Sequence, residues 1–204
     1  MNDAVSAGGN ASLTSANGVT VKAAVSTTNG DLTLGTNAGT IATTAGGTLS
    51  AGGNLSVVAP DAVAINDDAA AKGTMLIKAT VGAVEVAVDA KLTTSRTGAM
   101  TITAGTDVAV GNVAAGGDLT VTAGDDFAMH DNTTMTVHGQ RRASSAAATW
   151  RRGDQRPRQC YTADRPRPDA ERRGRKPPRH ARRQVAPRRR VDRPALPVLQ
   201  PAVT

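Results

Sequence analysis

Apolar and small polar residues alternate in short phrases that recur along residues 1–138, and each phrase begins with glycine. The alternation places apolar side chains at i and i+2, the period of a β-strand with one buried and one exposed face. The six phrases are Gly9-Asn10-Ala11-Ser12-Leu13, Gly30-Asp31-Leu32-Thr33-Leu34, Gly53-Asn54-Leu55-Ser56-Val57, Gly73-Thr74-Met75-Leu76-Ile77, Gly98-Ala99-Met100-Thr101-Ile102 and Gly117-Asp118-Leu119-Thr120-Val121. Their glycines are 21, 23, 20, 25 and 19 residues apart, which predicts a repeat of about twenty residues.

A second apolar position follows each of these glycines by ten or eleven residues. It is occupied by Val19, Ile41, Val63, Val84, Val108 and Phe127, and most of these start a further alternation. No comparable run follows the helical spacing i, i+3, i+4, i+7, and the many Gly, Thr, Val and Asn residues disfavour helix. Each unit is therefore predicted to contain two short strands, with a third left open.

Glycine marks the expected corners between these strands. Pairs occur at Gly46-Gly47, Gly52-Gly53 and Gly116-Gly117, and Asn-Gly occurs at Asn17-Gly18 and Asn29-Gly30. Since glycine adopts positive φ at little steric cost, we expect these positions to supply left-handed corners.

Two all-β arrangements can use such units: antiparallel hairpins in a sandwich or barrel, and a solenoid in which each unit is one coil. The near-constant repeat favours a parallel β-helix of about six coils, because equivalent positions then stack at every turn. Such a stack would be roughly 30 Å long at about 4.8 Å per strand layer, with unpaired strand edges at its ends. One internal ladder is predicted from Leu32, Leu55, Met75, Met100 and Leu119.

The phrases Gly30-Asp31-Leu32-Thr33-Leu34, Gly53-Asn54-Leu55-Ser56-Val57 and Gly117-Asp118-Leu119-Thr120-Val121, set in Ala/Gly/Thr-rich repeats, resemble the filamentous haemagglutinin-type exoproteins. The resemblance covers about two-thirds of the chain. It implies a right-handed parallel β-helix, export of the parent protein by an outer-membrane two-partner-secretion transporter, and attachment to a receptor or glycan on a host or neighbouring cell. The implied location is secreted or on the bacterial surface.

Several features of that family are not visible in residues 1–204. The opening Met1-Asn2-Asp3 has no basic and apolar signal region, and neither a secretion domain with its Asn-Pro motif nor a terminal cap is recognisable. We therefore expect a fragment of a longer adhesin shaft, without membrane insertion. The alternatives are the shaft of a contact-dependent growth-inhibition toxin, a polysaccharide-acting β-helix enzyme, and a nucleic-acid binder acting through its basic tail.

Composition divides the chain after His138. Residues 1–138 contain five basic and twelve acidic residues, a formal charge of −7, whereas residues 139–204 contain nineteen and five, a charge of +14. Nine of ten prolines follow the boundary, and eighteen of 21 glycines precede it. We therefore predict a repeat domain over 1–138 and a disordered Arg/Pro-rich tail over 139–204, because such a composition cannot bury a core.

The genetic code offers an explanation for the tail. Arg codons beginning CG become Gly, Ala, Val, Asp or Glu codons when shifted one base forward, and Ala, Thr, Ser or Pro codons when shifted the other way. Both sets resemble the composition lost at Gly139, so a frameshifted continuation of the repeat is our preferred hypothesis. A disordered tail without function and a basic arm that binds phosphates are the alternatives.

Individual motifs give no catalytic, cofactor or metal site, and we predict that the chain is not an enzyme. Arg152-Gly153-Asp154 resembles an integrin motif but arises easily in Arg-rich sequence. The acidic pairs Asp67-Asp68 and Asp125-Asp126 lie outside any Gly-Gly-x-Gly-x-Asp calcium repeat, so solvated turn residues are the expected interpretation. The remaining candidates are the sequons Asn10-Ala11-Ser12, Asn54-Leu55-Ser56 and Asn132-Thr133-Thr134, His130, His138, His180 and the lone Cys160.

Histidines eight residues apart lack the partner that a metal site needs, and the sequons are expected by chance in repeats rich in Asn, Ser and Thr. Cys160 has no catalytic histidine context and cannot form an internal disulfide. Paired carboxylates cut polysaccharides on some β-helices, but the basic and aromatic neighbours expected of such a site are nearly missing from residues 1–138. We therefore predict no cofactor and no specific nucleic-acid partner.

Overall fold

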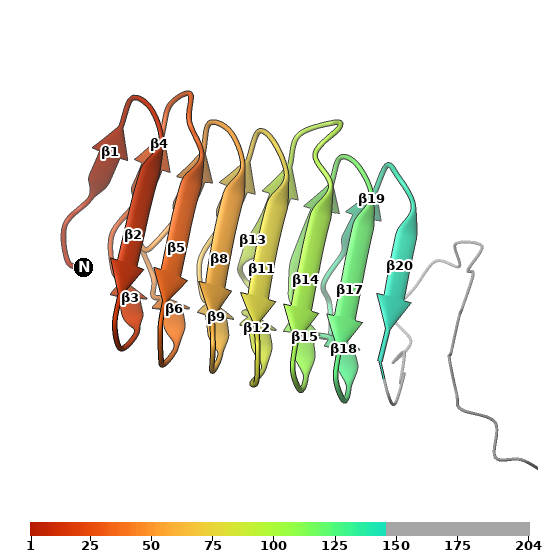
Figure 1. Ribbon diagram of the computed structural model, residues 1–204. Helices are drawn as coiled ribbons and strands as arrows, with labels where there is room; N and C mark the ends of the chain where they lie inside the picture. Colours follow the sequence, from red (N-terminus) through yellow and green to blue (C-terminus); the bar gives the residue numbers. More distant parts are fainter. Residues whose placement is uncertain (146–204) are drawn as a thin grey trace, which may run out of the picture. The chain divides into compact units, whose positions relative to one another are not determined.

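A computed structural model describes residues 1–145 as strands joined by short corners, and these residues contain no helix (Figure 1). None of them forms a segment that meets the length and apolarity required of a membrane-crossing helix. The predicted disorder of the tail concerns residues outside this described range, except for residues 139–145.

Three parallel sheets run along the stack of coils, and each complete coil contributes one strand to each sheet. Sheet A contains β1 (Val5–Ala7), β4 (Val25–Thr27), β7 (Leu49–Ala51), β10 (Ala69–Ala71), β13 (Lys91–Thr94), β16 (Asn112–Ala115) and β19 (Met135–Val137). Sheet B contains β2 (Ala11–Ser15), β5 (Leu32–Thr36), β8 (Leu55–Ala59), β11 (Met75–Ala79), β14 (Met100–Ala104), β17 (Leu119–Ala123) and β20 (Arg141–Ser144). Sheet C contains β3 (Val19–Val21), β6 (Ile41–Thr43), β9 (Val63–Ile65), β12 (Val84–Val86), β15 (Val108–Val110) and β18 (Phe127–Met129).

Residues 1–145 therefore form a right-handed parallel β-helix of six complete coils and two strands of a seventh (Figure 1). This confirms the predicted fold class and the predicted repeat. The sequence pattern did not decide whether each unit has a third strand. The structure shows that it does, and this strand belongs to sheet A. Strand β20 lies beyond His138, and it pairs in register with β17.

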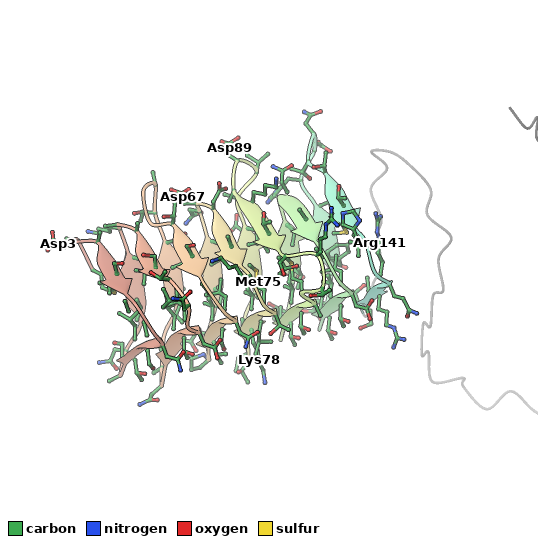
Figure 2. All side chains as sticks on the ribbon, turned by 90° about the horizontal axis from the view of Figure 1, so that it is seen from above. Asp3, Asp67, Met75, Lys78, Asp89 and Arg141 are labelled. Atoms are coloured by element: carbon green, nitrogen blue, oxygen red, sulfur yellow. The ribbon has the colours of Figure 1, made fainter. Side chains whose placement is uncertain are left out.

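The predicted internal ladder is confirmed by the strand register. Leu32 pairs with Leu55, Leu55 with Met75, and Met75 with Met100 and then Leu119 along sheet B. The second predicted position forms another ladder in sheet C, from Val19 through Ile41 to Phe127. The large residues of both ladders are almost fully buried within residues 21–127. Figure 2 shows Met75 between the sheets, whereas Lys78 of the same strand points away from them.

Small side chains suit this interior because the three sheets lie close together around it. Val, Leu, Ile, Ala and Met make up nearly all of the core, and Phe127 is its one aromatic residue. The short strands repeat the same inward register at every coil, so each apolar side chain packs on its counterpart above and below. Backbone ladders and apolar ladders together make the stack continuous.

Candidate functional site

The corner between sheets A and B explains the repeated phrase that begins with glycine. The glycines of this phrase stack on one another, and we call Gly9, Gly30, Gly53, Gly73, Gly98, Gly117 and Gly139 the glycine column. Gly53 N donates to Gly30 O at 2.8 Å, and Gly73 N donates to Gly53 O at 2.8 Å. A Cβ on any of the last six would overlap atoms of the preceding coil.

The requirement for these glycines is therefore close approach and not positive φ. Within residues 1–145, positive φ occurs at Gly18, Gly39, Gly46 and the non-glycine Asn132. The prediction of left-handed corners is correct for Gly18 and Gly46. It is wrong for Gly30, Gly47, Gly52, Gly53, Gly116 and Gly117, where a side chain would collide with the neighbouring coil at an ordinary φ.

A ladder of side-chain acceptors follows the glycine column. Asn10 Oδ1 accepts from Asp31 N at 2.9 Å, Asp31 Oδ1 from Asn54 N at 2.7 Å, and Asn54 Oδ1 from Thr74 N at 2.8 Å. Asp118 Oδ1 likewise accepts from Gln140 N at 2.7 Å. We call these four accepting amide or carboxylate side chains the Asx ladder. Each one satisfies a corner N–H of the next coil, which the parallel strands alone do not reach.

Two buried threonines close the longer A/B corners. Thr27 Oγ1 donates to Gly30 O at 2.6 Å and accepts from Gly52 N at 3.1 Å. Thr94 Oγ1 donates to Gly98 O at 2.6 Å and accepts from Gly116 N at 3.0 Å. These threonines precede corners of four and five residues, whereas the other A/B corners have three residues and follow Ala or Val. The hydroxyl thus replaces main-chain bonds that a longer corner cannot make.

The outward face of sheet B is the broadest regular surface of the coils, because its strands are the longest. Its side chains form two columns, which are Ser12, Thr33, Ser56, Leu76, Thr101, Thr120 and Arg142, and Thr14, Gly35, Val58, Lys78, Thr103, Thr122 and Ser144. Hydroxyl groups dominate both columns. Within the described residues this face has basic but no acidic side chains.

Acidic side chains gather instead at the corners. Glu85 is the one acidic residue that lies within a strand among residues 1–145. Figure 2 shows Asp67 and Asp89 projecting along one edge of the coils, away from Lys78. The outward face of sheet B is therefore a neutral to basic strip on an otherwise acidic solenoid, and it can offer hydroxyl groups in rows to a polar ligand.

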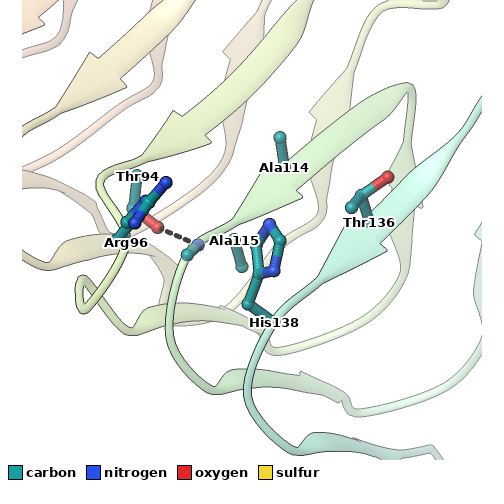
Figure 3. A pocket seen from close by; sticks show the side chains of 7 residues that line it. Thr94, Arg96, Ala114, Ala115, Thr136 and His138 are labelled. Carbon is teal, nitrogen blue, oxygen red and sulfur yellow. Dashed lines mark hydrogen bonds between the residues drawn. The ribbon is translucent and has the colours of Figure 1, made fainter. Parts of the chain in front are cut away.

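An open pocket of about 110 Å³ lies where sheet A meets the A/B corner (Figure 3). It is lined by Thr94, Arg96, Ala114, Ala115, Gly116, Thr136 and His138. Thr94 already bonds to Gly116 there, and Arg96 and His138 are exposed. The guanidinium, the imidazole and the Thr136 hydroxyl could donate to a small anion, but the pocket presents no arrangement of nucleophile and base.

Most of the candidate residues that lie within residues 1–145 are in the corners between strands. Asp67 Oδ2 accepts from Gly46 N at 2.6 Å, and Asp68 Oδ1 accepts from Lys91 N at 2.9 Å. Asp126 N donates to Asp107 Oδ1 at 3.0 Å. Both acidic pairs thus take part in links between coils. Residues 1–145 bring no three His, Cys, Asp or Glu side chains together as a possible metal site.

The histidines and sequons are dispersed. His130 follows β18 and its Nε2 is buried without a hydrogen-bond partner in the described part of the chain, whereas His138 follows β19 and is exposed. Asn10 and Asn54 of the sequons belong to the Asx ladder, and Asn132 has positive φ in the corner after β18. Arg152-Gly153-Asp154, Cys160 and His180 lie outside the described residues.

Sequence reasoning missed the Asx ladder, the buried threonines and the outward columns of sheet B. The signal for the Asx ladder was present, because Asn or Asp follows glycine in four of the six phrases. No protein-family model, curated protein or solved structure matches the chain.

Proposed function

We propose that this chain is a structural segment of an extended bacterial adhesin, in which stacked coils hold a binding surface away from the cell. The observation that carries the proposal is the continuity of the ladders: apolar, backbone and corner contacts repeat from coil to coil through residues 5–144. A stack of this kind resists bending because every coil is bonded to its neighbours on all three sheets. That property suits a shaft.

The binding surface that we propose is the outward face of sheet B. Thr101, Thr103, Thr120 and Thr122 place hydroxyl groups on two adjacent strands at equivalent positions. Such hydroxyl rows can exchange hydrogen bonds with the hydroxyl groups of a glycan. An acidic glycan would not be repelled, because this face has no acidic side chain within residues 1–145. We therefore infer a cell-surface glycan or glycoprotein as the partner.

Export belongs to the parent protein in this proposal. The phrases shared with haemagglutinin-type exoproteins support secretion through an outer-membrane two-partner transporter and display on, or release from, the bacterial surface. A shaft without enzymatic activity is consistent with side chains at the corners that are engaged in bonds between coils, such as Asp67 and Asp68.

Adhesion can be tested with beads that carry the full chain, incubated with animal cells and with bacterial cells. Excess heparin should be present, because the formal charge of +14 in residues 139–204 would otherwise bind anionic surfaces without specificity. We expect saturable attachment to at least one cell type. Treatment of the cells with glycosidases should reduce that attachment if the partner is a glycan.

A pair of matched variants locates the surface. Thr101→Glu with Thr120→Glu places two charges on adjacent strands of sheet B, and Thr20→Glu with Ala42→Glu places two on adjacent strands of the outward face of sheet C. We expect the sheet B variant to lose at least about tenfold in attachment, on the scale of two or more lost hydrogen bonds. The sheet C variant should attach like the native chain. A well-folded chain that shows no saturable attachment to any cell would contradict the adhesive function.

A further inference from the structure

The inward ladder of sheet B ends in a charged residue. Met100 pairs with Leu119, and Leu119 pairs with Arg141 of β20. The first two of these side chains are 0% and 1% exposed, whereas Arg141 is exposed. Arg141 therefore occupies an inward position of the ladder, in the last strand of sheet B. Among the described residues, β20 pairs with β17 on one side and with no strand on the other.

The guanidinium of Arg141 also reaches the neighbouring sheet. Its Nη2 donates to the carbonyl oxygen of Met135, the first residue of β19, at 3.1 Å. Met135 pairs with Val113, and Val113 N donates to Thr134 O of the following coil at 2.9 Å. In a parallel ladder the N–H and C=O of one residue face the same neighbour. The carbonyl of Met135 therefore faces the open edge, and Arg141 occupies an acceptor that a following coil would use.

The opposite end of the stack is different. The inward residues Val5, Ala11, Leu13 and Val19 of the first coil pack on the core and are only partly buried. The strands β1, β2 and β3 carry no charged side chain, and the charged amino group of Met1 lies on sheet C, where it donates to Thr20 O at 2.6 Å. If the first coil of a second copy were stacked on the seventh coil in the same register, Ala11 would lie over Arg141.

We propose that Arg141 is an end cap that prevents head-to-tail stacking of one copy of this chain on another. Stacking would bury the guanidinium without a counter-ion, and it would displace the Met135 carbonyl from its partner. Natural sheets use inward-pointing charges on edge strands for the same purpose. This cap was not recognisable in the sequence, because Arg141 stands among other arginines and only the register places it inside.

The experiment compares Arg141→Met with Arg142→Met in the full chain. Both variants remove one positive charge, but Arg142 is on the outward face of β20. Met already occupies the same ladder at Met75 and Met100, so Arg141→Met should fold. We expect the native chain and Arg142→Met to sediment as monomers over a wide concentration range. Arg141→Met should form species that grow with concentration.

A double variant identifies the surface on which stacking occurs. Ala11→Arg places a charge at the same ladder position of the first coil, so it should return Arg141→Met to the monomeric state. Arg141→Leu, which matches Leu119, serves as a second apolar variant. The proposal is overturned if the native chain already stacks, if both apolar variants remain monomeric or fail to fold, or if Arg142→Met associates equally. Association that persists with Ala11→Arg would also overturn it.

Discussion

The corners on the two sides of sheet A follow different rules. The A/B corners carry the glycine column and the Asx ladder, and five of the seven have three residues. The corners that lead from sheet C to sheet A range from one residue, Gly111, to five residues, 44–48 and 130–134. Side chains bond to a neighbouring coil at both kinds of corner, as Asp67 does with Gly46 and Asp68 with Lys91 at the C/A corners. The A/B corners repeat the same bond at equivalent positions, whereas the C/A corners vary more in length and in the residues that bond. A repeat is thus visible in sequence where the same bond recurs from coil to coil.

The largest expected effect comes from the glycine column. In Gly98→Ala the new Cβ would overlap the carbonyl oxygen of Gly73, so the corner must shift. We expect a loss of about 3 kcal/mol in unfolding free energy, the upper part of the range for overpacking. Thermal and denaturant unfolding followed by circular dichroism measures it.

Gly35→Ala is the matched control for that substitution. Gly35 lies on the outward face of β5, and a Cβ there meets nothing within 4 Å. Alanine should stabilise the strand by about 0.5 kcal/mol by restricting the unfolded chain. Equal losses in the two variants would mean that glycine is needed for chain flexibility and not for close approach.

The second effect concerns the buried hydroxyl at the longest A/B corner. Thr94→Val keeps the shape of the side chain but leaves Gly116 N without its partner. Gly98 O loses one of its two hydrogen bonds and keeps the one from Gly117 N. We expect a loss of about 2 kcal/mol in unfolding free energy, since each unpaired buried group is costly. Thr93→Val, on the outward side of the same strand, should change it by less than about 0.5 kcal/mol. If Thr94→Val left the unfolding free energy unchanged, water would be the hydrogen-bond partner of the backbone groups at this corner.

The Asx ladder should contribute less, because its bonds are exposed. Asp31→Ala removes the acceptor of Asn54 N and should cost about 1 kcal/mol, as for other side-chain caps of backbone N–H groups. Asp89→Ala removes the same charge from a C/A corner, where the Asp89 side chain makes no hydrogen bond within residues 1–145. Its melting temperature should match that of the native chain. A larger loss of unfolding free energy in Asp89→Ala than in Asp31→Ala would mean that the C/A corner contributes more to stability than the A/B corner.

Ala99 interrupts the Asx ladder and offers a gain. It directly precedes Met100, as Thr74 precedes Met75 and Asp118 precedes Leu119 in the neighbouring coils, but it has no side-chain oxygen. Ala99→Asn should provide an acceptor for Asp118 N and stabilise the chain by about 0.5 kcal/mol. Ala99→Leu, of similar size without an acceptor, should give no gain. A rise in melting temperature with both variants would point to packing as the cause.

The smallest effect is expected at a variable corner. One glycine inserted between Val88 and Asp89 lengthens an exposed C/A corner, in which Val88 O accepts from Asn112 Nδ2 at 3.0 Å. It should change the unfolding free energy by less than about 0.5 kcal/mol, because loop entropy grows slowly with length and this exposed bond precedes the inserted residue. The far-ultraviolet spectrum should remain that of a β-protein. A loss larger than that of Asp31→Ala would show that the C/A corners also fix the register.

Much of the fold was predictable from local patterns. The ladder from Leu32 to Leu119 and the second one from Val19 to Phe127 follow directly from period two within a repeat of about twenty residues. The strands of sheet A were harder to assign because they are short and contain threonine and alanine. In Val25-Ser26-Thr27, for example, Thr27 faces inward although it is polar, since its hydroxyl is satisfied by the A/B corner.

The candidate surface was less predictable than the fold. Outward residues such as Thr101 and Thr120 alternate with core residues, but a single strand does not show that they stand next to each other 19 residues apart in sequence. The glycines illustrate the same limit: Gly53 and Gly46 look equivalent in sequence, yet the first avoids a collision and the second adopts positive φ.

The sequence by itself determined the strands, the repeat and the inward ladders, because apolar burial repeats with a period that local alternation records. Only the tertiary structure decided which groups meet across coils: the glycine column, the Asx ladder, the hydroxyl rows of sheet B and the inward position of Arg141. These contacts join residues about one coil apart along the chain. Their partners are fixed by the register between coils, which the packing of all three sheets sets together.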